Sequence, residues 1–136
     1  MRELILDANV LVRFLVQDVP EQAKAAAKLV ALAESGDLVL VVDPMIIAET
    51  VYVLTSFYKQ PREAVANALL SFVQAEGVAA VDPSRLVDAL LRFKRTPVDF
   101  ADAWLAAMSA GTNREVASFD RDLDRFADVK RYEPVG

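Results

Sequence analysis

Four acidic residues, Asp7, Glu49, Asp102 and Asp120, are the strongest candidates for chemistry in this sequence. The chain contains no Cys and no His. Thiolate nucleophiles, Ser-His-Asp triads, imidazole acid–base pairs and ordinary zinc sites are therefore excluded. A set of carboxylate oxygens suits Mg²⁺ or Mn²⁺. The residue types thus indicate a divalent-metal site built from oxygen ligands.

Asp7 and Asp120 each follow a short apolar run, residues 3–6 and 115–119, that predicts a buried strand. In open parallel sheets, ligands bind in a crevice at the carboxyl ends of the strands. Each acid also has a simpler interpretation. Asp7 would be a helix N-cap, and Asp120 would belong to a solvated charged turn. Of the acids in this turn, Asp120 is nearest the strand end, Asp122 is the second choice and Asp124 the third.

Glu49 lies in a predicted helix over residues 44–58, and its neighbours three and four positions away are all apolar: Met45, Ile46, Tyr52 and Val53. We expect its side chain to point towards the interior or a cleft. An unpaired charge there costs several kcal/mol, and a metal ion is the simplest partner. The alternative is a buried Glu that is neutral or bonded to other side chains.

Asp102 follows Asp99 by three residues, so in a helix over residues 99–110 the two acids share one side. Asp99 would also serve as the N-cap of this helix, and Asp102 would then be favoured by the positive end of the helix dipole. If Asp102 joins Asp7, Glu49 and Asp120 in one crevice, cations are needed to keep the carboxylates ionised. This conjunction predicts a Mg²⁺ or Mn²⁺ site.

The elements that would position these acids alternate between strand and helix. Strands are predicted at residues 3–6, 38–42 and 115–119, with a weaker one at 78–81, and helices at 20–34, 44–58, 61–76, 83–94 and 99–110. Parallel strands need crossovers, which are usually helical. We therefore predict an α/β fold, a parallel sheet with helices on both faces, formed by a single domain over residues 1–136.

Composition supports a globular chain, with 54% hydrophobic residues, four Gly and six Pro. The start of the chain has no apolar core of a signal peptide. The longest apolar run, residues 38–42, is far shorter than the roughly 18 residues of a membrane span. We expect a soluble, cytoplasmic protein. The net charge of −5 does not favour nucleic acid, although bound divalent cations would offset most of it.

Four motifs in this order resemble a known family: Ile5-Leu6-Asp7-Ala8-Asn9-Val10, Ala48-Glu49, Asp99-Phe100-Ala101-Asp102-Ala103-Trp104 and Ser118-Phe119-Asp120-Arg121-Asp122-Leu123. The chain is similar to the PIN-domain nucleases, and within them to the VapC-like toxins of bacterial and archaeal toxin–antitoxin pairs. The resemblance implies a three-layer fold with a five-stranded parallel sheet, a Mg²⁺ or Mn²⁺ site, endoribonuclease activity and a small antitoxin partner.

The resemblance also implies roles for particular acids. Asp7, Glu49, Asp102 and Asp120 fall on the catalytic, metal-binding quartet of the family, with Asp99 and Asp122 as accessory acids. Ala8 stands where the family often has a hydroxyl residue, whereas Ser118 keeps a hydroxyl. The loss at Ala8 bears on catalytic efficiency, because a hydroxyl there could orient Asp7 or a bound water.

Five basic residues are candidates for holding RNA: Arg13, Arg92, Lys94, Arg95 and Arg121. Phosphate contacts position a nucleic acid without identifying its bases. The alternative is that these side chains are ordinary solvated or salt-bridged cations.

The helix over residues 44–58 carries more apolar surface than one buried stripe needs. The excess predicts a homodimer interface. The alternative is a core helix that is covered on all sides.

These observations predict a divalent-metal-dependent endoribonuclease, the toxin of a toxin–antitoxin pair. One alternative is a Mg²⁺-dependent phosphotransfer domain of receiver or haloacid-dehalogenase type, although Asp7-Ala8-Asn9 lacks the second acid expected two residues on. The other is a catalytically silent PIN-like scaffold that only binds a partner.

Overall fold

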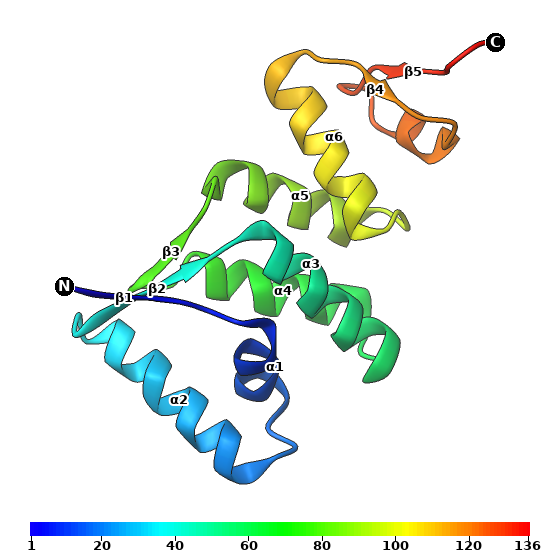
Figure 1. Cartoon of the computed structure of the whole chain (residues 1–136). Helices are drawn as coiled ribbons and strands as arrows, with labels where there is room; N and C mark the ends of the chain where they lie inside the picture. The colour runs from blue at the N-terminus through cyan, green and yellow to red at the C-terminus, as the bar shows by residue number, and fades with distance from the viewer. The chain divides into compact units, whose positions relative to one another are not determined.

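Five short parallel strands and six α-helices alternate along the chain in the computed structural model, which describes all residues from 1 to 136. The chain divides into an N-terminal unit, Met1–Pro83, and a C-terminal unit, Ser84–Gly136 (Figure 1). The α/β class and the parallel pairing of the strands are confirmed. The expectation of a single domain stays a prediction.

The N-terminal unit contains three strands, four α-helices and a π-helical turn. They are β1 (Arg2–Ile5), α1 (Ala8–Val16), α2 (Pro20–Glu34), β2 (Leu38–Val42), α3 (Pro44–Tyr52), the π-helical turn η1 (Val53–Phe57), α4 (Arg62–Val73) and β3 (Val78–Ala80).

The three-stranded sheet has the order β1-β2-β3, with Ile5 beside Val41 and Leu40 beside Val78. Leu40 is fully buried on one face of the central strand, and Val41 is partly covered on the other. Helix α2 packs on β2 and α4 packs on β3. The continuous apolar sequence of β2 is thus explained, because a strand covered on both faces needs no polar alternation.

Gly77 makes the turn into β3 possible. Its φ of +80° lies in the left-handed region, and a Cβ atom built there would stand 2.2 Å from the carbonyl oxygen of Ala33. Its own carbonyl oxygen accepts a hydrogen bond from the Leu40 backbone N–H at 2.8 Å. Only glycine fits both the backbone conformation and the close approach to α2.

The C-terminal unit contains α5 (Pro83–Arg95, whose first residue closes the N-terminal unit), α6 (Phe100–Thr112), β4 (Val116–Ala117), the 3₁₀ turn η2 (Arg121–Arg125) and β5 (Arg131–Tyr132). Strands β4 and β5 form a parallel pair. The Phe93 and Phe100 rings meet edge to face with centroids 6.3 Å apart, and Leu123 of η2 is fully buried. These contacts give the unit its own apolar core.

Three expectations from the sequence need correction. The five strands form a three-stranded and a two-stranded sheet instead of one five-stranded sheet. The strand predicted over residues 115–119 is limited to Val116–Ala117. The helix predicted over residues 44–58 is α-helical only to Tyr52 and continues as η1. In this segment the hydroxyl groups of Thr50 and Thr55 donate to backbone carbonyls four residues earlier, contacts that often accompany bent helices.

None of the helices combines the length with the apolar character that crossing a membrane requires.

Candidate active site

The carboxyl groups of Asp102 and Asp120 lie close enough in the C-terminal unit for Asp120 to raise the pKa of Asp102. Asp102 stands in the first turn of α6, and Asp120 precedes η2. Burial, followed by the hydrogen bond to Asp120 and the negative charges of Asp99, Asp120 and Asp122, raises the pKa of Asp102 from 3.8 to about 6. Two neighbouring carboxyl groups repel each other once both are ionised. A cation would relieve that repulsion.

Short hydrogen bonds hold the backbone around Asp120. The Asp120 N–H donates to the Ser118 hydroxyl at 2.9 Å, and its Oδ1 accepts from the Asp122 N–H at 2.9 Å. The Ser118 carbonyl oxygen in turn accepts from Arg131 Nη1 at 3.0 Å. The hydroxyl that the sequence retains at Ser118 therefore orients the backbone at the acid pair.

The acids near the Asp102–Asp120 pair make hydrogen bonds or ion pairs with other groups. Asp99 Oδ1 accepts from the Asp102 N–H at 2.9 Å and caps α6, which confirms the capping interpretation of Asp99. Asp122 pairs with Arg125 at 3.5 Å. Two bonds from Arg131, at 3.0 and 3.1 Å, lower the pKa of Asp124. By contrast, the charged groups that shift the pKa of Asp102, which are Asp99, Asp120 and Asp122, are all negative.

Asp7 occupies the N-cap position of α1, but its carboxylate accepts no capping hydrogen bond. Asp43 stands at the same position before α3, and its Oδ1 accepts from the Met45 N–H at 2.8 Å. The capping interpretation of the Asp7 side chain is therefore wrong. This exposed carboxylate is available to another ligand.

Glu49 is exposed, which excludes the interior position that was one of the two expectations, while a position at a cleft stays a prediction. Helix α3 buries the side with Ile47 and Val51. Met45 and Tyr52, on the side of Glu49, are themselves 75% and 69% exposed. The apolar neighbours of Glu49 thus form a solvent-facing surface, and its carboxylate is open to water.

The structure thus brings Asp102 and Asp120 together in the C-terminal unit, while Asp7 and Glu49 belong to the N-terminal unit. No three acids of either unit form a group able to hold a metal ion by themselves. Mg²⁺, however, is commonly held by one or two carboxylates and completes its sphere with waters and substrate phosphates. The two oxygen donors of the Asp102–Asp120 pair fit this coordination.

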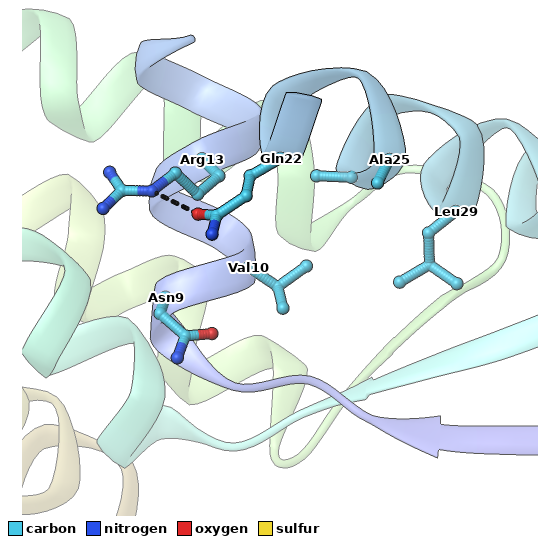
Figure 2. Close-up of a pocket in the computed structure, with 7 residues that line it drawn as sticks. Asn9, Val10, Arg13, Gln22, Ala25 and Leu29 are labelled. Carbon is cyan, nitrogen blue, oxygen red and sulfur yellow. Dashed lines mark hydrogen bonds between the residues drawn. The ribbon is translucent and has the colours of Figure 1, made fainter. Parts of the chain in front are cut away.

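Arg13 is bonded within the N-terminal unit. Its guanidinium donates to Gln22 Oε1 at 2.9 Å, to Asp18 Oδ1 at 3.1 Å and to the Tyr58 hydroxyl at 3.1 Å. The Tyr58 hydroxyl also donates to Asp18, which lowers the pKa of that carboxyl. Figure 2 shows Arg13 and Gln22 beside an open cavity of about 660 Å³ between α1 and α2. These bonds leave Arg13 poorly suited to hold a phosphate.

Arg92 also makes its hydrogen bonds and ion pairs within the protein. It donates to Asp88 at 2.9 Å and to both oxygens of Asp128, and it lies over the Phe126 ring at 5.1 Å. Arg95 and Arg121 are exposed and Lys94 is half-buried, and none of the three takes part in the ion pairs described above. Of the five predicted RNA contacts, these three remain suited to the role, which stays a prediction.

Sequence reasoning did not find the position of Arg131 behind the acid pair. Its guanidinium joins Asp124, Glu133 and the Ser118 carbonyl oxygen. No pattern in the sequence indicates this role, because the donor and the Ser118 acceptor are 13 residues apart in an irregular segment.

The parallel strands and the helices between them define an α/β protein. The acids that follow its strands and begin its helices provide oxygen donors of the kind that bind divalent metal ions. The sequence matches the PIN domain family over residues 4–129. The chain therefore belongs to the PIN domain family, a nuclease family whose members are typically metal-dependent. A comparison with curated proteins found no match.

Proposed function

We propose that this chain is a divalent-metal-dependent endoribonuclease that hydrolyses RNA phosphodiester bonds. The observation that carries the proposal is the Asp102–Asp120 carboxyl pair, which lacks a cationic partner in a chain of the PIN domain family. Perturbed acids that face no arginine or lysine are typical of functional sites. The family supports nuclease chemistry, and RNA as the substrate is the proposal.

The residues supply binding and orientation. Asp102 and Asp120 would hold Mg²⁺ or Mn²⁺, with Asp99 and Asp122 as accessory charges. The resemblance to the PIN-domain nucleases implies that Asp7 and Glu49 also act as catalytic acids. Such an ion, when bound, neutralises phosphate charge and activates water. With no Cys or His in the chain, we assign the attack on phosphorus to water and to no side chain.

The charge distribution is compatible with an RNA substrate. Residues 84–136 contain nine of the fifteen Lys and Arg residues and nine of the twenty Asp and Glu residues. The net charge of −5 therefore lies entirely in residues 1–83. The unit with the acid pair is neutral by itself, and a bound divalent cation would make it positive.

Cleavage of a labelled single-stranded RNA with Mg²⁺ tests the proposal. Asp102→Asn and Asp7→Asn should each lower the rate about 100-fold or more, because a lost metal ligand costs at least as much as a lost supporting group. Asp43→Asn is the matched control, since it changes an acid at the equivalent helix start and asparagine caps equally well. Equal rates for wild type and Asp102→Asn would discard the proposal.

Two other functions are separated by simple measurements. A silent scaffold would show no heat of Mn²⁺ binding in calorimetry, whereas the proposed site would. A phosphotransfer domain would form a stable acyl-phosphate on an Asp after incubation with a phosphodonor. The match to a nuclease family supports hydrolysis over phosphotransfer.

The finer proposal, a VapC-like toxin with a small antitoxin partner, rests on the resemblance of the four acidic motifs. Expression in bacterial cells should then arrest growth, and the Asp102→Asn variant should not. Normal growth with abundant active enzyme would contradict the toxin role and leave the nuclease proposal intact.

We also propose a homodimer formed through α3 and η1. Met45, Tyr52 and Phe57 are 75%, 69% and 75% exposed, so the alternative of a fully covered core helix is wrong. Exposed apolar surface of this kind favours association. Sedimentation that shows only monomer at micromolar concentration would contradict the dimer.

A further inference from the structure

Phe119 is an exposed aromatic side chain on a fixed backbone. Its side chain is 72% exposed, and its ring takes part in none of the ring–ring contacts of the chain. The residues on both sides are held: the Ser118 N–H donates to the Tyr132 carbonyl at 3.0 Å, and the Asp120 N–H donates to the Ser118 hydroxyl at 2.9 Å. The fold thus holds a large apolar ring at the surface without using it in a core.

The position of Phe119 relates it to the acid pair. It directly precedes Asp120, and consecutive Cα atoms are about 3.8 Å apart. A phosphate held through a divalent cation at Asp102 and Asp120 would therefore bring a neighbouring base within reach of the ring. Arg121, exposed and two residues further on, adds a cation for the RNA backbone.

We propose that Phe119 is a stacking platform for one base of a single-stranded RNA. The residues that flank it in the sequence, Ser118, Asp120, Arg121 and Asp122, are all polar. A single exposed ring does not by itself define a protein-binding surface. It does provide the π-face on which a base of any type stacks. This inference rests on the proposed ribonuclease function, and it adds how the substrate is held.

The test measures binding of a fluorescein-labelled single-stranded RNA with Ca²⁺ in place of Mg²⁺, so that the carboxylates carry a divalent cation while cleavage is suppressed. Phe119→Ala should weaken binding about 10-fold, the effect expected for the loss of one stacked base. Phe119→Leu should weaken it similarly, because leucine keeps the apolar bulk but lacks the π-face, whereas Phe119→Tyr should retain binding. Binding of an RNA duplex, whose bases are already stacked, should not respond to any of these changes.

Leu32→Ala is the control, because Leu32 is an exposed apolar side chain of α2 in the N-terminal unit and lies outside the proposed dimer interface. It should leave RNA binding unchanged. A second readout uses Phe119→Trp in a Trp104→Phe background, so that the chain's single tryptophan is at residue 119. Stacking of a base should quench its fluorescence when RNA is added.

Binding by Phe119→Leu equal to wild type, an equal loss in Leu32→Ala, or unquenched tryptophan at saturating RNA would overturn this inference. Cleavage is measured separately with Mg²⁺. A chain that binds RNA through Phe119 but does not cut it would overturn the proposed function alone. A chain that cuts RNA and binds it equally well after Phe119→Ala would overturn the stacking role alone.

Discussion

The N-terminal and C-terminal units use their acidic residues in different ways. In the C-terminal unit, Arg92 and Arg131 each neutralise two acids, Asp88 with Asp128 and Asp124 with Glu133. The Asp102–Asp120 pair in the same unit has no such partner. The N-terminal unit instead has exposed acids such as Asp7 and Glu49 and carries the net negative charge.

The number of acids in a region therefore does not by itself identify a functional site. The acids that pair with arginines stabilise the fold. The Asp102–Asp120 pair, which has no cationic partner, lowers the stability of the fold, as functional sites often do. The N-terminal unit depends more on close packing, for example between Gly77 and Ala33. Substitutions should therefore affect the two units through different physical causes.

The largest expected effect on stability comes from breaking the close packing of the N-terminal unit. Gly77→Ala places a Cβ atom 2.2 Å from the Ala33 carbonyl oxygen in a residue with φ of +80°. Unfavourable backbone conformation and overpacking together should cost about 3 kcal/mol. For a chain of this size the melting temperature should fall by roughly 10 °C, measured by circular dichroism.

Gly36→Ala is the control for Gly77→Ala, because Gly36 has a φ of +84° but no atom within 4 Å of a built Cβ. It should cost only about 1 kcal/mol, the penalty for a left-handed alanine. If both variants lose the same stability, the close approach to Ala33 has no energetic role.

A smaller effect of opposite sign is expected at the acid pair. The folded-state pKa of Asp102 is about 6, above its ordinary value of 3.8. Between these values the folded chain binds more protons than the unfolded chain, so stability falls as the pH rises through this window. Without metal, Asp102→Asn should therefore be more stable than wild type by about 1 kcal/mol at about pH 8, after allowance for solvent screening.

The difference between Asp102→Asn and wild type should disappear below about pH 4, where the wild-type carboxyl is protonated in both states. Asp124→Asn should behave in the opposite way and lower the melting temperature at neutral pH, because Arg131 lowers the pKa of Asp124 in the folded state. Thermal melts in EDTA across this pH range measure both. A loss of stability in Asp102→Asn at about pH 8 would contradict a repulsive acid pair.

The smallest effect is expected at the basic residues that the fold leaves unpaired. Replacing both Lys94 and Arg95 by Gln should lower the slope of log K against log salt for RNA binding by about 1.4, since each phosphate contact contributes about 0.7 for single strands. Lys24→Gln with Lys28→Gln, on the exposed side of α2, is the control. An unchanged slope would remove Lys94 and Arg95 from the RNA contacts.

The ends of a helix were predicted well where the sequence carries a local start or stop signal. Helix α2 runs over Pro20–Glu34, as expected from its initial Pro and the following Gly36. Strand β2 also has the predicted limits. Strand β5 was not predicted, because it contains only two residues and is defined by backbone bonds such as that from Val116 N–H to the Lys130 carbonyl. Such bonds leave little pattern in the side chains.

The candidate site was less predictable than the helices. The apolar neighbours of Glu49 show that one side of α3 is apolar, but not that this side is exposed. Arg92 was expected to be a candidate for RNA, yet its partner Asp128 lies 36 residues away. Local sequence contains no signal for such a pairing, because it depends on how distant segments pack.

By itself the sequence determined the types of most elements and the absence of thiol and imidazole chemistry, because periodicity, helix capping and residue type act locally. The folded structure was needed to show that Asp102 lies beside Asp120, that Asp99 and Asp43 cap helices while the Asp7 side chain does not, and that Arg13 is bonded to Tyr58. Electrostatic interactions and hydrogen bonds depend on distance in space, and the folded chain sets that distance.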